Sequence, residues 1–402
     1  MAENKDKKVL NVPNLRFPEF QGEWKECKLG DIAMVVGGGT PDTNNHKYWN
    51  GDIQWFTPSE IGRDKYVTNS LRTISEEGLN KSSAKLLPIG TILLSSRATV
   101  GECSINKVEC TTNQGFQSLI TKEYFSKEFV FYLMQTKRKE LIRKSCGSTF
   151  LEISANEVRK IKIAVPTSKE QEKISKLLAL LDERIATQNK IIEDLKKLKC
   201  AIIENVLNNC HDNKMRLGDV GIYIRGLTYS SKDVVEQKGT IVMRSNNIVS
   251  GGMLDYCNNI VRVNKQISQE QQLQNGDIVI CMANGSSALV GKTSFYDGKC
   301  LSPITVGAFC GIYRSKMPIT KWLFQTNRYH RNIWKSLQGG NGAIANLNGE
   351  DILRMSFPTP DKSTIGHCIK LLSSLDLLIK NNVSLYAMFS QQKEYLLQQM
   401  FI

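Results

Sequence analysis

The sequence predicts an α+β protein in which two similar mixed α/β domains are joined by two long antiparallel helices that form a coiled coil. Three observations lead to this fold class. The chain has 402 residues, which is too long for one ordinary domain. It carries a weak internal duplication, and each copy ends in an apolar pattern of coiled-coil type. We therefore expect a pseudo-twofold internal repeat.

The duplication is clearest in two pairs of short segments. Leu177–Ile185 reads LLALLDERI, and Leu371–Ile379 reads LLSSLDLLI 194 residues later. Tyr132–Arg138 (YLMQTKR) matches Trp322–Arg328 (WLFQTNR) at a separation of 190 residues. Shorter matches keep the same order, and small changes in their separation are expected when loops gain and lose residues. The chain is therefore interpreted as two copies of one unit.

Each copy ends in a long predicted helix. Apolar residues recur at alternating spacings of four and three from Ile174 and again from Cys368. Polar residues interrupt both patterns at equivalent places, and one interruption in each is a lysine, Lys199 and Lys393. Matching interruptions are typical of a seam that fixes the register of paired helices. The pairing residues predicted from this pattern are Leu178, Leu181, Ile185 and Ile192 in the first helix and Leu372, Leu375, Ile379 and Phe389 in the second.

Proline and glycine mark the expected boundaries. Pro166 and Pro360 each end a strand and set the start of a helix. Strands are predicted at Thr91–Leu94 and Asp277–Cys281, and a helix with Ser126 as its N-cap is predicted to extend to Ser145. These features divide the chain into a first domain (1–165), a central helical spacer (166–210), a second domain (211–360) and a C-terminal helix (361–402).

The charge balance favours a polyanionic partner. The chain has 53 Lys and Arg against 39 Asp and Glu, a net charge of +14 at pH 7. Two predicted helices, 126–145 and 320–338, each carry an excess of basic residues. This charge is consistent with phosphate contact, and equally with an ordinary solvated helix face.

The loops between the shared elements differ between the copies and are rich in Gly, Ser, Thr, Asn and Arg. Arg pairs with guanine, Asn with adenine, and Ser or Thr with either base, so such loops can read DNA. The alternative is that Gly, Ser and Asn only form turns. The candidates for DNA contact are Thr40, Arg63, Lys65, Ser96, Arg97, Thr99, Arg225, Thr228, Tyr229, Arg244, Asn246, Asn247, Asn284, Ser286, Ser287 and Asn341.

No motif for catalysis or metal binding stands out. The 11 cysteines form no C-x-x-C pair, and the 4 histidines lie far apart in the sequence, so no metal site is predicted. Gly285–Thr293 resembles a phosphate loop but has one residue too many between its glycines. Adenine-methyltransferase, nuclease and helicase motifs are missing, and no apolar run is long enough to span a membrane. We expect a cytoplasmic protein that recognises DNA, with reduced thiols, no catalytic site and no membrane partner.

Several segments point to a known family. They are Val12–Phe20 followed by Trp24, then Gly51–Trp55, Asn113–Phe116 and Glu170–Ile174. With the duplication and the twin helices, they make the chain resemble the specificity subunits of type I restriction–modification systems over essentially its whole length. The second copy departs from the pattern, with Val306–Phe309 and Ser363–Gly366 at the corresponding places.

The resemblance implies that each domain is a target-recognition domain that reads one half of a bipartite site in double-stranded DNA. It also implies that the helices set the spacing and dock two methyltransferase subunits, which two restriction subunits join. The partners would use S-adenosylmethionine, ATP and Mg²⁺, and this chain would bind no cofactor. The alternatives are an enzyme, a coiled-coil scaffold and a free-standing DNA-binding protein. Missing motifs disfavour the enzyme, and two divergent loop sets on a basic frame disfavour a pure scaffold.

Overall fold

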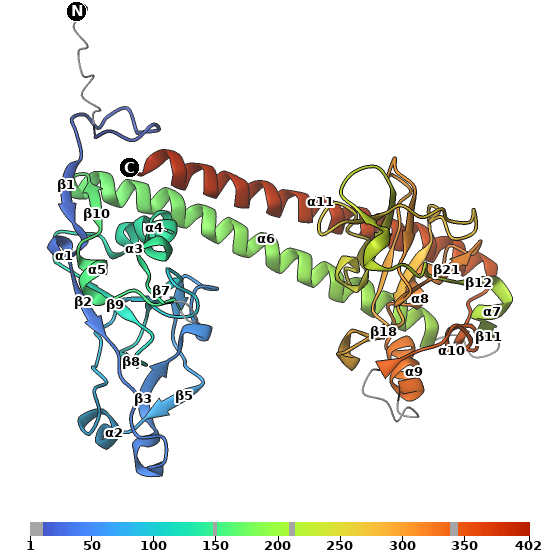
Figure 1. The fold of residues 1–402 in the computed structure, drawn as a ribbon, viewed down its shortest axis with the longest axis horizontal. Coiled ribbons are helices and arrows are strands. Elements are labelled where there is room, and N and C mark those ends of the chain that lie inside the picture. Colours follow the sequence, from blue (N-terminus) through green and yellow to red (C-terminus); the bar gives the residue numbers. More distant parts are fainter. Residues whose placement is uncertain (1–10, 148–150, 209–213, 338–344) are drawn as a thin grey trace, which may run out of the picture. The chain divides into compact units, whose positions relative to one another are not determined.

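The computed structural model describes residues 11–147, 151–208, 214–337 and 345–402, and Figure 1 follows their course. The chain forms two compact units. Unit 1 comprises the residues up to Asn189 together with Ser384–Ile402, and unit 2 comprises Lys190–Val383. Both long helices, α6 (Ser168–Asn208) and α11 (Lys362–Met400), are therefore divided between the units. The bounds predicted from the sequence treat each long helix as a segment of its own. Each compact unit instead contains one domain together with part of both helices.

Two β-sheets and a short strand pair form the domain of unit 1. The larger sheet has the order β2-β9-β6-β7-β4, antiparallel except for the last pair, and the smaller sheet has the order β5-β3-β8, with β3 and β8 parallel. β1 pairs antiparallel with β10, which directly precedes the long helix α6 in the chain. The strands are β1 (Lys25–Lys28), β2 (Ala33–Gly37), β3 (Trp49–Phe56), β4 (Tyr66–Val67), β5 (Arg72–Ile74), β6 (Ile92–Leu94), β7 (Cys103–Asn106), β8 (Cys110–Thr112), β9 (Gln117–Thr121) and β10 (Lys162–Val165).

Unit 2 repeats this topology. Its larger sheet, β12-β21-β17-β19-β15, has the same sequence of strand directions as the larger sheet of unit 1. In the second sheet, β13-β16-β14-β20, a parallel pair again joins the last two strands. The strands are β11 (Lys214–Arg216), which pairs with β23 (Ser356–Pro358), β12 (Gly221–Arg225), β13 (Val234–Val235), β14 (Thr240–Met243), β15 (Gly252–Met253), β16 (Val261–Val263), β17 (Ile278–Cys281), β18 (Ala283–Asn284), which pairs with β22 (Ala345–Asn346), β19 (Thr293–Phe295), β20 (Ile304–Val306) and β21 (Cys310–Ser315).

Both predicted short helices are divided in the structure, and the one predicted at 320–338 forms Thr320–Leu323 and Asn327–Leu337 within the described residues. The hydroxyl of Ser126 accepts a hydrogen bond from the N–H of Phe129 (3.2 Å), as expected of an N-cap. The helix predicted from Ser126 to Ser145 is in fact two helices, because the backbone leaves the helical region at Lys137 (ψ 0°). The short helices are α1 (Leu29–Ile32), α2 (Glu76–Asn80), α3 (Lys127–Thr136), α4 (Arg138–Lys144), α5 (Ala155–Arg159), α7 (Leu217–Val220), α8 (Thr320–Leu323), α9 (Asn327–Leu337) and α10 (Gly349–Leu353).

The long helices pack antiparallel within each unit. In unit 1, Ile174 and Leu178 share a core with Met400 and Phe401. In unit 2, Ile203 and Leu207 of α6 share a core with Cys368, Leu372 and Leu375 of α11. In each unit, residues farther along α6 meet residues that come earlier in α11, so the two helices run in opposite directions. Leu178, Leu181, Ile192, Leu372 and Leu375 are buried as the apolar pattern predicts, and Ile185, Ile379 and Phe389 are half-buried.

A charged network recurs at the helix pair of each unit. In unit 1, Asp182 accepts a hydrogen bond from the hydroxyl of Tyr132 (2.6 Å) and pairs with Lys393 (2.6 Å). In unit 2, Asp376 accepts one from the indole N–H of Trp322 (3.1 Å) and pairs with Lys199 (3.0 Å). The two lysines that interrupt the apolar seam are therefore partners of the aspartates in the duplicated segments. Buried charges of this kind are stable only when they are paired and hydrogen-bonded.

The start of α6 is held by a carboxylate that is 1% exposed. The two oxygens of Glu170 accept hydrogen bonds from the guanidinium of Arg16 (both 2.8 Å), and the indole N–H of Trp24 lies 3.3 Å away. This ion pair raises the pKa of Arg16. The next residue, Gln171, accepts a hydrogen bond from the N–H of Ser126 (3.0 Å). The segments at 12–24 and 170–174 therefore have a structural role, which is to anchor the long helix on the domain of unit 1.

Candidate nucleic-acid interface

In unit 1 the loops that follow β2, β3, β6 and β8 meet. The N–H of Gly39 donates to the carbonyl of Thr112 (2.8 Å), and the N–H of Ser96 donates to the carbonyl of Gly115 (2.8 Å). A Cβ on Gly38 would lie 2.1 Å from the carbonyl oxygen of Asn113, so only glycine allows this approach. Loops from distant parts of the sequence are therefore joined into one surface.

Two tryptophans support the loop that follows β2. The indole N–H of Trp55 donates to the carbonyl of Gly39 (2.9 Å), and that of Trp49 donates to the carbonyl of Asp42 (3.0 Å). The guanidinium of Arg72 lies 3.6 Å from the centre of the Trp49 ring and is exposed. Stacking of this kind holds a cation in place while leaving its N–H groups available. Arg72 was not among the candidates from the sequence, because only the pairing of β3 with β5 brings it to this loop.

The predicted contact residues of unit 1 divide into two groups. Thr40, Arg97 and Thr99 lie on the joined loops, where Thr40 donates to the side-chain oxygen of Gln114 and Arg97 pairs with Glu152 (2.8 Å). Arg63 is exposed on the segment before β4.

Two other predicted contacts do not fit a DNA-facing position. Ser96 is fully buried beneath the joined loops. The amine of Lys65 donates to the hydroxyl of Tyr132 (3.0 Å), and burial lowers the pKa of Lys65. Its positive charge therefore belongs to the network around Asp182. These placements correct the predictions for Ser96 and Lys65, because neither side chain is presented with the loop surface.

Unit 2 has a hollow of about 400 Å³ where three of its loops meet. Its lining combines aromatic, polar and cationic side chains. Three of the predicted contacts lie here, and neighbouring residues that the composition of the loops did not single out complete the wall. The lining residues are Leu227, Tyr229, Ser230, Ser231, Arg244, Ser245, Asn246, Gly307, Ala308, Phe309 and Cys310.

The frame of this hollow matches the loop cluster of unit 1. A Cβ on Gly226 would lie 2.1 Å from the carbonyl oxygen of Gly307, the same approach that Gly38 makes in unit 1. Asn247 accepts the N–H of Arg244 (3.0 Å) and donates to the carbonyls of Asp255 (3.1 Å) and Asn258 (2.9 Å). Asn247 is buried, so its amide supports the loop and has no free group for a base. This corrects its predicted role.

Of the other candidates of unit 2, Asn284 contacts a residue that lines this hollow. Asn284 donates to the hydroxyl of Ser245 (3.2 Å) and accepts the N–H of Ser286 (3.0 Å), which connects the loop after β18 with the loop after β14. Arg225 and Thr228 have exposed side chains on the loop that leaves β12. Ser287 is exposed at the start of a short 3₁₀ turn, and Asn341 lies outside the described residues.

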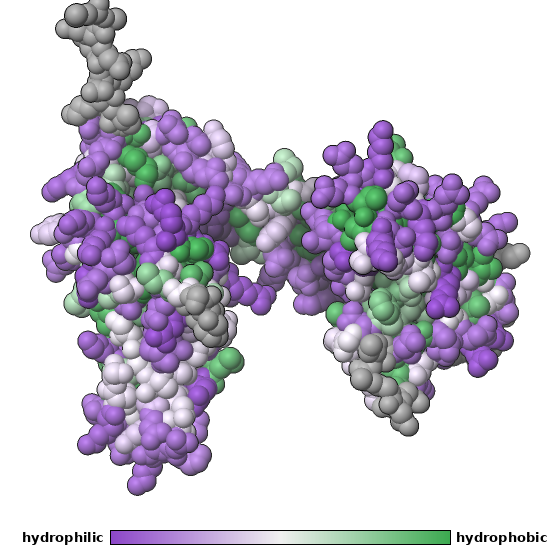
Figure 2. Space-filling view, in the orientation of Figure 1, coloured by the Kyte–Doolittle hydropathy of each residue, from purple (hydrophilic) through white to green (hydrophobic). Residues whose placement is uncertain are grey.

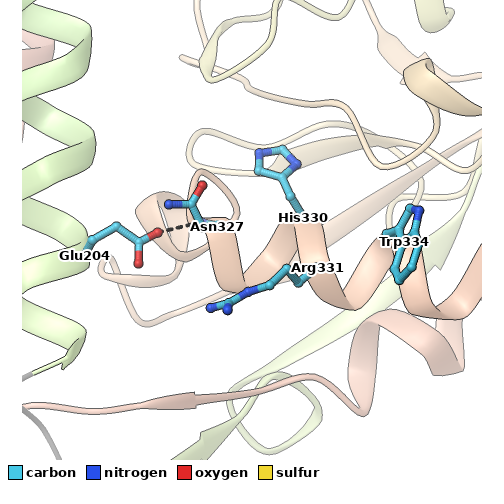
Figure 3. Close-up of a pocket in the computed structure, with 5 residues that line it drawn as sticks. All are labelled: Glu204, Asn327, His330, Arg331 and Trp334. Atoms are coloured by element: carbon cyan, nitrogen blue, oxygen red, sulfur yellow. Dashed lines mark hydrogen bonds between the residues drawn. The ribbon is translucent and has the colours of Figure 1, made fainter.

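A second hollow of unit 2, about 690 Å³, lies along the basic helix α9 (Figure 3). Glu204 extends from α6 and accepts the N–H of Asn327 (2.5 Å) at the first residue of α9. His330, Arg331 and Trp334 line the rest, and burial lowers the pKa of His330. A carboxylate, one guanidinium and a histidine of lowered pKa do not form a single-sign site for phosphate.

Metal-binding clusters and membrane-spanning helices are both missing from the described part of the chain. Within residues 11–147, 151–208, 214–337 and 345–402, no three His, Cys, Asp or Glu side chains come together in a way that would hold a metal ion. No helix in this part of the chain combines the length and apolar character needed to cross a lipid bilayer. The visible face of both units is mainly hydrophilic, with separate apolar patches (Figure 2).

Comparison with known proteins finds a matching family and several similar proteins. Residues 21–197 match the family described as "Type I restriction modification DNA specificity domain". The chain is 37% identical over 187 residues to the type I restriction enzyme MjaIX specificity subunit of Methanocaldococcus jannaschii (46% of this chain, 43% of that protein). It is 31% identical over 190 residues to the EcoR124I/EcoR124II specificity subunit of Escherichia coli (46% of each chain). The matches therefore span less than half the length of these relatives.

The fold has a solved counterpart. The S subunit of a type I restriction–modification system from M. genitalium superposes with a TM-score of 0.56 over 97% of this chain and 99% of that one, at 14% sequence identity. At this identity the likeness concerns the fold. The chain therefore shares its fold with a protein whose structure is solved.

Proposed function

Because residues 21–197 match the type I restriction modification DNA specificity domain, we propose that the chain is the DNA-recognition subunit of a type I restriction–modification complex. The observation that carries the proposal is one scaffold present twice with two different loop surfaces. The larger sheets of the two units have the same strand order and directions, whereas the loops above them differ. Such a pair suits a bipartite target whose halves have different sequences.

Each unit is proposed to read one half-site. In unit 1 the contacts come from Thr40, Arg97 and Thr99, to which we add Arg72. In unit 2 they come from the hollow that contains Arg244 and from the loops around it. Arg and Asn side chains discriminate purines in the major groove, and exposed cations contact phosphates. The net charge of +14 supplies the sequence-independent attraction to DNA.

The long helices are proposed to set the spacing between the half-sites and to dock partner subunits. Apolar side chains are exposed on both helices, among them Leu180 and Ile191 on α6 and Leu377, Met388 and Tyr395 on α11. Exposed apolar side chains grouped on one element favour a protein partner. We assign two methyltransferase subunits to these helices, with two restriction subunits completing the complex.

The chemistry is proposed to belong to the partners. The methyltransferase subunits would use S-adenosylmethionine to methylate N6 of an adenine that is flipped out of the duplex into their own pocket. The restriction subunits would use ATP and Mg²⁺ for cleavage of unmethylated DNA. The contribution of this chain is to hold the target in register, without a catalytic group of its own.

The test is to co-express the chain with its candidate methyltransferase subunit and to map N6-methyladenine across the host genome. We expect a new bipartite motif, methylated on both strands, that disappears when this chain is omitted. The matched control is the quadruple variant with Leu181, Ile185, Leu375 and Ile379 changed to Asp, which should lose the motif with the helix pair. If the wild-type complex forms and no motif appears, the chain is a scaffold.

A further inference from the structure

Phe309 is a large apolar side chain that is 68% exposed directly before β21. In the strand registers Gly311 occupies the place of Gln117, so Phe309 corresponds to Gly115 and the buried Cys310 corresponds to the buried Phe116. The alignment of the two copies from sequence alone was therefore wrong by one residue at this point. Unit 2 presents a phenyl ring where unit 1 has a glycine.

The exposure of Phe309 is built into the backbone. Its carbonyl oxygen accepts hydrogen bonds from the N–H groups of Met282 (2.9 Å) and Ala283 (3.1 Å). The same short connection donates from Gly307 to the carbonyl of Met243 (2.9 Å). A main chain held on two sides displays the ring in a defined place rather than on a loose loop. Presenting a phenyl ring to water is unfavourable, and the hollow beside it gives a partner a place to bind.

The surroundings of the ring define the chemistry of that partner. Phe309 lines the hollow of unit 2 together with Arg244, Asn246 and Tyr229. Arg244 and Asn246 are exposed and offer the donors and acceptors that recognise purine edges. Among the base edges of the major groove, only thymine presents a methyl group, and an apolar side chain is the group that recognises it. The hollow thus combines polar groups for purines with one apolar ring for a methyl.

We propose that Phe309 reads a thymine of the second half-site by contact with its 5-methyl group, flanked by purine contacts from Arg244 and Asn246. This inference rests on the proposed function, since it names the base that one part of the recognition surface selects. It gives unit 2 a specificity element that unit 1 lacks, because Gly115 stands at the corresponding place.

The test replaces each thymine of the mapped second half-site, one at a time, by deoxyuridine, which removes only the methyl group. Binding is measured with the complex of the full chain and its methyltransferase partner. For the wild type we expect one position at which uracil weakens binding about fourfold, the value of one buried methyl. Phe309→Ala should bind the thymine and uracil duplexes equally, whereas Phe309→Leu should retain part of the difference. Thymines of the first half-site are the internal control.

The outcomes separate this inference from the proposed function. A wild-type complex that methylates no motif contradicts the proposed function itself. A specific complex whose second half-site contains no thymine, or whose response to uracil is the same in Phe309→Ala, overturns the role of Phe309 alone. Loss of the methyltransferase subunit from Phe309→Ala on a sizing column would also overturn it, since the ring would then be a protein contact.

Discussion

Unit 1 and unit 2 have the same strand order, but they anchor their long helices differently. In unit 1 the start of α6 is fixed by the buried carboxylate of Glu170, which is bound by Arg16 and Trp24. At the equivalent place in α11, 194 residues later, Thr364 is exposed and donates only to Asp361 (2.6 Å). The charged network with an aspartate at its centre is present in both. The comparison shows that both copies keep the aspartate–lysine pair that joins the two helices. The contacts that attach the start of each helix to its own domain differ between the copies.

The largest expected difference between the units comes from removing the central aspartate. Asp376→Asn leaves Lys199, whose side chain is 5% exposed, without its carboxylate, and also removes the partner of Lys321. We expect a loss of about 3–5 kcal/mol in the free energy of unfolding. Asp182→Asn strands Lys393, which is 21% exposed, and should cost about 1–2 kcal/mol. Hydrogen exchange resolved by unit measures both effects.

The control for this pair is Asp194→Asn. Asp194 lies on the exposed face of α6 and only faces Lys197 at 3.8 Å, so its removal should change stability by less than about 0.5 kcal/mol. Equal losses for Asp182→Asn and Asp376→Asn would contradict the view that burial of the lysine sets the size of the effect.

A smaller difference is expected at the starts of the helices. Arg16→Ala leaves Glu170 buried without its guanidinium and should destabilise unit 1 by about 3 kcal/mol. Adding Glu170→Gln should restore much of this loss, because the unpaired charge is then gone. Thr364→Ala in unit 2 removes a surface hydrogen bond and should cost about 0.5 kcal/mol. The measurement is denaturant unfolding combined with hydrogen exchange of the first turns of α6 and α11. A double variant no more stable than Arg16→Ala would contradict the view that the unpaired charge of Glu170 causes the loss.

The two glycines at the loop crossings offer a symmetric test. A Cβ on Gly38 or on Gly226 would meet a carbonyl oxygen at 2.1 Å, so alanine at either position should cost about 1–3 kcal/mol and displace the loops of that unit. Binding to one half-site should fall while the other is unchanged. Gly285→Ala, with no atom within 4 Å of the added Cβ, is the matched control. Methylation of DNA carrying only one intact half-site reports each effect, and equal loss at both half-sites would argue against one unit per half-site.

The smallest effects are expected at single exposed arginines. Arg97→Ala and Arg244→Ala should each weaken discrimination at one half-site by about 1–2 kcal/mol if they contact base edges. Arg72→Ala should instead weaken binding equally on all sequences and lower the slope of affinity against salt by about one, as a phosphate contact does. Binding titrations at several salt concentrations separate the two classes. A uniform loss for Arg97→Ala or Arg244→Ala would move that residue to the phosphate class.

The repeat and the helix pairing were predictable because they leave a periodic signal in the sequence. Leu178 and Leu372 recur at seam positions and are buried as expected. The four-and-three spacing continued from Ile174 reaches Ile202 and Val206, but Ile203 and Leu207, one residue later, are the more deeply buried. A straight helix drifts relative to a strict seam, and this last part of α6 also packs on the domain of unit 2.

The recognition surface was predictable only as a set of loops. Composition identified Arg244 and Asn246, which line the hollow of unit 2, but it also selected Asn247, Ser96 and Lys65, which serve the scaffold. The composition of a loop does not distinguish an asparagine that caps a turn from one that faces solvent. Their difference is set by which backbone groups come near, and the sequence does not display that.

The sequence by itself determined that this protein is a duplicated α+β chain with two paired helices, because periodicity and repetition are local and additive along the chain. Only the tertiary structure decided which side chains are presented at the surface. Arg72 reaches its loop through a strand pairing, and the strand registers place the buried Cys310, not the exposed Phe309, at the position of Phe116. The physical reason is that exposure depends on contacts between distant segments, and a change of one residue in a connecting loop is enough to alter those contacts.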